Sequence, residues 1–124
     1  RLITPTTDIK RLSLILEKSS GFIYYVSITG ITGTKQATNT DIKEAIGKIN
    51  ELTDIPIAVG FGIKSKEQVS KISRISNAVV VGSHIVKIIE DECSKNNINY
   101  DKILEDIKTE VIKLSSGLNS KVNI

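Results

Sequence analysis

Residues 56–63 read Pro-Ile-Ala-Val-Gly-Phe-Gly-Ile, and the interpretation of the whole chain starts from this stretch. It is a short apolar run that breaks into the tripeptide Gly60-Phe61-Gly62. Runs of this kind are typical of strands buried on both faces, as in a parallel sheet covered by helices. A glycine at the end of such a strand lets the backbone turn tightly and approach a ligand closely. We therefore expect a central strand here, followed by a functional turn.

The same pattern recurs further along the chain, where the apolar run at 77–81 breaks into Gly82-Ser83. Between the two runs, Ser65 and Gln68 have the spacing of a capping box, which predicts the start of a helix. Two successive strand ends of this kind resemble the phosphate-binding end of (β/α)8 barrels, formed by the loops after strands seven and eight and a helix N-terminus.

The rest of the chain alternates strand patterns with helix patterns. Strands are expected to start near residues 2, 22, 56 and 78, and helices are expected after each of them. The first helix is capped by Thr6, Thr7 or Asp8, and the second starts at Thr40 or Asp41. A short helix is expected at 84–90 and a final one at 101–114. The segment 28–40 has no period and is expected to be a binding loop or lid.

This alternation predicts an α/β fold with a parallel sheet and right-handed crossovers. Four βα units are half of a (β/α)8 barrel, so we expect a single domain, residues 1–124, that corresponds to half of such a barrel. The absence of methionine and the start at Arg1 are expected of a piece of a longer or processed chain. Because the outer strands of a half-barrel are open edges, dimerisation or aggregation of the isolated chain is expected.

Composition excludes several classes of protein. The net charge of +3 and the absence of basic-aromatic interleaving argue against nucleic-acid binding. The single cysteine, Cys93, excludes an internal disulfide framework and is typical of a reducing compartment. No apolar stretch reaches the length of a membrane span, so a cytoplasmic protein without membrane contact is expected.

Three segments together resemble the tryptophan synthase alpha subunit family. Residues 21–33, 56–63 and 80–87 are similar to that family's sixth strand with its mobile loop, its seventh strand, and its eighth strand with the following helix. The resemblance extends from Leu2 to Leu114 and corresponds to strands 5–8, the C-terminal half of the family's barrel.

The resemblance implies cleavage of indole-3-glycerol phosphate to indole and glyceraldehyde 3-phosphate, a lyase step of tryptophan biosynthesis. It implies a beta subunit as partner in an alpha2-beta2 complex, and no cofactor in this chain, because pyridoxal phosphate would belong to the beta subunit. It also assigns the site. The phosphate would bind at Gly33, Gly62, Gly82 and Ser83, the pocket wall would contain Gly60 and Phe61, Tyr24 would face the substrate, and Thr32 would lie on the lid.

The family's acid–base pair, a glutamate and an aspartate, belongs to the N-terminal half, so no catalytic residue and no metal ligand is assigned here. The 124 residues alone are therefore expected to be inactive. Asp8 lies near a strand end, but helix capping is the expected role. The alternatives are another phosphate-binding barrel enzyme and a non-catalytic phosphate-binding half-barrel. His84, which has no evident partner in the sequence, is interpreted as a helix-surface residue.

Overall fold

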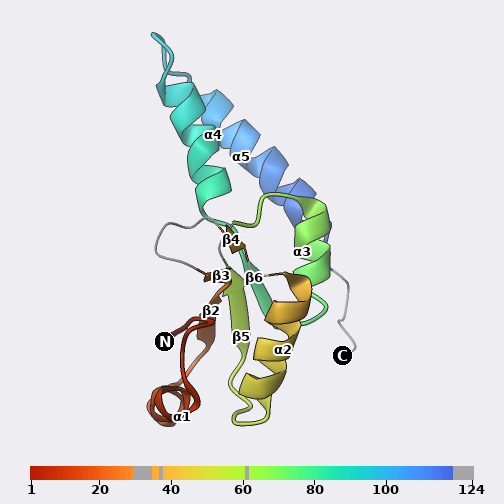
Figure 1. The fold of residues 1–124 in the computed structure, drawn as a ribbon. Coiled ribbons are helices and arrows are strands. Elements are labelled where there is room, and N and C mark those ends of the chain that lie inside the picture. Colours follow the sequence, from red (N-terminus) through yellow and green to blue (C-terminus); the bar gives the residue numbers. More distant parts are fainter. Residues whose placement is uncertain (30–34, 37, 61, 119–124) are drawn as a thin grey trace.

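The computed structural model describes residues 1–29, 35–36, 38–60 and 62–118. Within them a four-stranded parallel sheet has the order β1-β2-β5-β6 (Figure 1). Its strands are β1 (Leu2–Ile3), β2 (Ile23–Val26), β5 (Ile57–Gly60) and β6 (Ala78–Val80). The parallel α/β architecture predicted from the alternating patterns is confirmed.

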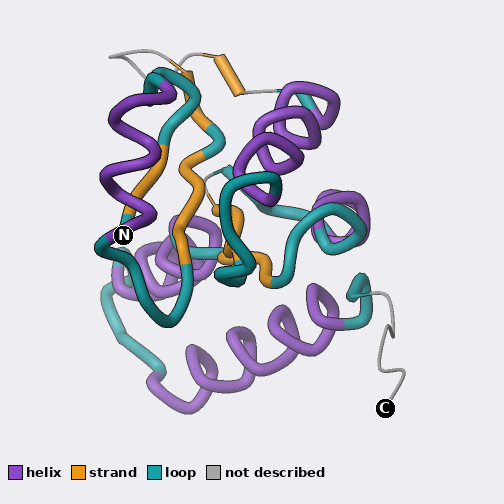
Figure 2. Tube along the Cα trace, turned by 90° about the horizontal axis from the view of Figure 1, so that it is seen from below, coloured by secondary structure: helices purple, strands orange, loops and turns teal. Residues whose placement is uncertain are grey.

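Five helices accompany these strands in the described part of the chain. They are α1 (Ile9–Glu17), α2 (Asn39–Asn50), α3 (Lys66–Ile72), α4 (Ser83–Cys93) and α5 (Tyr100–Ser115). Seen from below, most of the helices lie around the margin of the molecule and the strands of the parallel sheet lie between them (Figure 2). The helices α4 and α5 pack side by side beyond the ends of the strands (Figure 1). None of the helices in the described residues has both the length and the apolarity needed to cross a membrane.

The helix starts follow the capping residues in the sequence. Asp8 caps α1 by accepting a hydrogen bond from the backbone N–H of Arg11 at 2.9 Å, as expected. The start expected for α2 was slightly too late, because Thr38 and Asp41 form a capping box that places the first helical residue at Asn39. The reciprocal bonds of this box satisfy two amide groups that the helix itself leaves free.

Two further expectations need correction. The helix expected at 84–90 extends from Ser83 to Cys93. Its contact with α5, which the sequence pattern did not reveal, accompanies the additional turn. The segment 28–40 also contains regular structure: β3 (Ile28–Thr29) and β4 (Lys35–Gln36) pair antiparallel. Strands of two residues are too short to produce the alternation from which a strand is predicted.

The two faces of the parallel sheet differ. Strand register places Ile3, Tyr25, Val59 and Val79 on one face, where they pack with apolar side chains of α1, α2, α3 and α5 into one core. Burial raises the pKa of Tyr25 on this face, with a smaller contribution from Asp41. The other face presents Leu2, Tyr24, Ala58 and Ala78, and Leu2 is 66% exposed. The helices of this chain therefore cover only one side of the sheet.

Candidate functional site

Two strand ends meet at one edge of the sheet. In the β5–β6 ladder Gly60 pairs with Val80, and Gly62 and Gly82 each follow two residues later. Because the strands are neighbours and parallel, these two turns leave the sheet side by side. In an open α/β sheet, ligands bind beyond the carboxyl ends of the strands. The structure thus brings together the two glycine turns that the sequence singled out.

The turn after β5 is constrained by contacts within the protein. The carbonyl of Gly60 accepts hydrogen bonds from the amide and the hydroxyl of Ser27, at 3.1 and 2.9 Å. On the other side of Gly60 the ring of Tyr24 lies so close that a Cβ at this position would overlap its hydroxyl. Gly62 has φ of +74°, a left-handed conformation that favours glycine. Ser27, which fixes the end of β5, was not found by sequence reasoning, since its partner lies on another strand.

The start of α3 is satisfied by its own side chains. Ser65 accepts from the amide of Gln68 at 3.3 Å, and Gln68 Oε1 accepts from the amides of Ser65 and Lys64 at 3.1 and 2.7 Å. The predicted capping box is confirmed. At its first residue, Lys66, the backbone carbonyl also lies so close to Gly117 that a Cβ at 117 would overlap it. The amides of Ser65 and Gln68 at this helix end are therefore already used.

The start of α4 is different. Its N-cap is Gly82, which has no side chain to cap the helix, and Ser83 is the first helical residue. A Cβ at Gly82 would meet no atom of the described residues within 4 Å, and its φ of −116° is open to any residue. Both residues are exposed. Free amides and the helix dipole at such an end attract an anion, and a phosphate accepts hydrogen bonds from both amides and hydroxyls.

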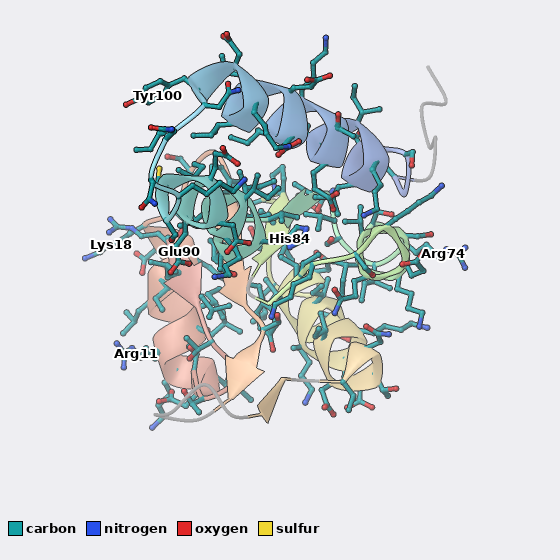
Figure 3. The ribbon with its side chains drawn as sticks, turned by 90° about the horizontal axis from the view of Figure 1, so that it is seen from above. Arg11, Lys18, Arg74, His84, Glu90 and Tyr100 are labelled. Atoms are coloured by element: carbon teal, nitrogen blue, oxygen red, sulfur yellow. The ribbon has the colours of Figure 1, made fainter. Side chains whose placement is uncertain are left out.

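His84 follows directly in α4, where it is half-buried and has a partner that was not evident in the sequence. Its Nε2 lies 2.9 Å from Oε1 of Glu110 on α5, and the side chains are 27% and 15% exposed. Figure 3, which looks down on this end of the molecule, shows His84 near the centre of the view. The pair is separated by twenty-six residues in sequence, so the spacing of charges along either helix could not reveal it.

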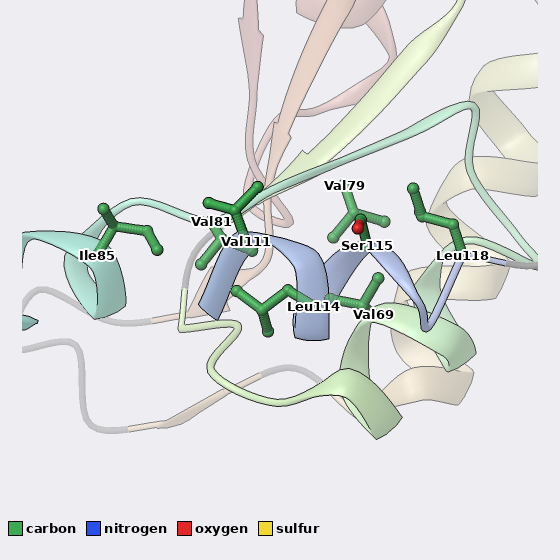
Figure 4. A pocket seen from close by; sticks show the side chains of 8 residues that line it. All are labelled: Val69, Val79, Val81, Ile85, Val111, Leu114, Ser115 and Leu118. Atoms are coloured by element: carbon green, nitrogen blue, oxygen red, sulfur yellow. The ribbon is translucent and has the colours of Figure 1, made fainter. Parts of the chain in front are cut away.

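An apolar cavity of about 180 Å³ lies on the helix-covered side of β6 (Figure 4). Its walls come from β6, α3, α4 and α5 and their flanking residues: Val69, Val79, Val81, Ile85, Val111, Leu114, Ser115 and Leu118. None of the described residues assigned to phosphate binding, Gly62, Gly82 and Ser83, lines it. Since small-molecule pockets usually enclose about 300–1,000 Å³, it is small for a substrate site. We therefore place the candidate site at the strand ends and not in this cavity.

Three assigned residues, Thr32, Gly33 and Phe61, lie outside the described residues. The remaining five come from the two turns and from β2: Gly60, Gly62, Gly82, Ser83 and Tyr24. Among the residues that the structure describes, no group of three His, Cys, Asp or Glu side chains could hold a metal ion. The described site is thus built from backbone groups, one hydroxyl and one phenol.

The sequence of this chain matches one family of known proteins. The family model described as tryptophan synthase alpha chain matches residues 1–115. The chain belongs to the tryptophan synthase alpha chain family. It is 45% identical over 114 residues to the tryptophan synthase alpha chain of Zymomonas mobilis, and 51% identical over 89 residues to that of Novosphingobium aromaticivorans. These alignments cover 90% and 72% of this chain, but only 42% and 34% of the two relatives.

Solved structures agree with this assignment. The tryptophan synthase alpha subunit from Campylobacter jejuni superposes with a TM-score of 0.68 at 32% identity, over 88% of this chain and 42% of the other. The tryptophan synthase alpha chain structures that this chain matches are (β/α)8 barrels, and this chain covers about 40% of their length. In a closed barrel, the face that presents Leu2 and Tyr24 points to the interior.

Proposed function

We propose that this chain supplies the phosphate-binding part of a tryptophan synthase alpha-type lyase, which cleaves indole-3-glycerol phosphate to indole and glyceraldehyde 3-phosphate. One observation carries the proposal: two neighbouring parallel strands end at the same level, and the helix after the second strand begins at an exposed, uncapped glycine. Family membership makes the phosphate of indole-3-glycerol phosphate the expected anion.

In this proposal the phosphate lies against the turns at Gly62 and Gly82, where the Ser83 hydroxyl and the first amides of α4 donate to its oxygens. Gly33 completes the phosphate contacts, and Gly60 and Phe61 form the pocket wall. Tyr24, on the sheet face not covered by helices, faces the substrate. Thr32 lies on the lid.

The chemical step needs a group that protonates the indole carbon and a group that takes the proton of the glycerol hydroxyl. We assign neither to this chain. Asp8, the acid near the end of β1, caps α1 and is thereby committed to a structural bond. The acid–base pair would come from the part of the barrel that these residues do not include, so the 124 residues alone should bind without turnover.

We further propose the partners and location typical of the family. A beta subunit would receive the indole and would carry the pyridoxal phosphate, so this chain itself would need no cofactor. A soluble biosynthetic complex of this kind would function in the cytoplasm.

A chimera tests the function. This chain would replace the matching segment of the Zymomonas mobilis alpha chain, to which it is 45% identical. We expect the chimera to release indole from indole-3-glycerol phosphate, and the 124 residues alone to release none. A chimera that unfolds cooperatively yet neither binds nor cleaves the substrate would contradict the proposal.

A further inference from the structure

Helix α4, which starts at the candidate site, buries few of its side chains. Its one fully buried residue among those described is Glu92, near its far end. Ile85 packs partly against the core, whereas Val86 is 61% exposed and Ile89 is 38% exposed. Apolar burial therefore fixes the rotation of α4 less firmly than that of α2, which buries three isoleucines.

A polar contact fixes the first turn of α4 instead. The bond from His84 to Glu110 is the side-chain hydrogen bond that links α4 to α5 in the described part of the chain. Glu110 is itself held by Lys113, whose Nζ lies 3.1 and 3.2 Å from its two oxygens. The hydrogen bond from His84, followed by that from Lys113, lowers the pKa of Glu110. Glu110 is therefore a charged acceptor near neutral pH, and such bonds are stronger than neutral ones.

We propose that His84 is a positioning residue for phosphate binding: its bond to Glu110 holds the first turn of α4 so that Ser83 and the adjacent amides face the phosphate. This inference rests on the proposed function and deepens it. His84 acts through Glu110 and α4, because its Nε2 is engaged with Glu110. Donors that are held in place before the ligand arrives bind it more tightly, since less freedom is lost on binding.

The test measures affinity for indole-propanol phosphate and for the same alcohol without phosphate, by isothermal titration of the chain. We expect His84→Ala to weaken binding of the phosphorylated ligand by about three- to ten-fold and to leave binding of the alcohol unchanged. His84→Gln should recover most of the loss, because its terminal amide can donate to Glu110. Adding Glu110→Ala to His84→Ala should cause no further loss.

Lys87→Ala is the matched control. Lys87 lies on the same helix, but it pairs with Glu90 and Asp91 of α4 and not with α5, so its loss should leave affinity unchanged. If His84→Ala does not unfold cooperatively, Glu110→Ala replaces it, with the same expected loss, because it removes the acceptor.

The outcomes separate the two proposals. A folded wild-type chain that binds no phosphorylated ligand overturns both the phosphate site and the role of His84. Wild-type binding that His84→Ala leaves unchanged overturns the positioning role alone. An equal loss for both ligands also overturns it, because that pattern would indicate a general structural role.

Discussion

The starts of α3 and α4 differ in how the first amide groups of the helix are capped. Both helices follow a glycine at the end of a neighbouring strand, yet α3 begins with a capping box of Ser65 and Gln68, whereas α4 begins at Gly82 without a side-chain cap. At the first turn the glycine is needed by the protein, since Gly62 has positive φ. At the second turn nothing in the described structure requires a glycine. The first glycine is thus required by the fold, whereas the second leaves the start of α4 open for the phosphate that we propose to bind there.

The largest effect on stability is expected at the end of α5 that contacts α3. Gly117→Ala should lower the free energy of unfolding by about 1–3 kcal/mol, because the new Cβ would overlap the backbone carbonyl of Lys66, which cannot rotate away as a side chain can. Urea unfolding with an unchanged m-value measures this. Gly47→Ala in α2, where a Cβ has open space, is the control and should be stabilising. Equal stability of wild type and Gly117→Ala would show that the contact is not required.

Gly82→Val addresses the other turn directly. We expect affinity for indole-propanol phosphate to fall at least about ten-fold, whereas the free energy of unfolding should fall by no more than about 1 kcal/mol, the cost of a poorer N-cap. The physical reason is that the valine has space in the protein but occupies the volume assigned to the phosphate. Titration and urea unfolding of the same sample separate the two effects. Unchanged affinity would show that the turn at Gly82 does not bind the phosphate.

Two serine substitutions sharpen the comparison. Ser65→Ala should destabilise the chain by about 1 kcal/mol through loss of the N-cap and should leave phosphate affinity unchanged. Ser83→Ala should change stability by less than about 0.5 kcal/mol, because Ser83 is exposed, and should weaken phosphate binding a few-fold. Both quantities are measured on both variants. The reverse pattern would mean that α3, and not α4, receives the anion.

The smallest effect concerns pH. The folded state lowers the pKa of Glu110 below its ordinary value of 4.5, so its contribution to stability is present above that value and is lost as pH falls through the lowered pKa. The difference in unfolding free energy between wild type and Glu110→Gln should therefore shrink as the pH is lowered from 6 to about 3. Gly47→Ala, which adds no ionisable group and whose Cβ has open space, should show no such trend. A constant difference across this range would argue against the bond.

Much of this fold could be predicted because its signals are local. The apolar runs that end in glycine predicted the parallel strands, and the spacing of Ser65 and Gln68 predicted the start of α3. Both patterns depend on residues a few positions apart. The bond between His84 and Glu110, and the bonds from Ser27 to Gly60, could not be predicted, because they join distant parts of the chain. The roles of the glycines could not be separated either, since positive φ at Gly62 and open space at Gly82 are properties of the folded backbone.

Helix α5 also links the starts of α3 and α4 at a defined distance. It touches the start of α4 through Glu110, and the turn after its end touches the start of α3 through Gly117. Glu110 and Gly117 are seven positions apart, which corresponds to about 10 Å at a helical rise of 1.5 Å per residue. The length of α5 therefore sets the spacing between the two turns. One inserted residue between Glu110 and Gly117 would rotate one contact by about 100° relative to the other, so this segment should be intolerant of insertions even where its side chains are exposed.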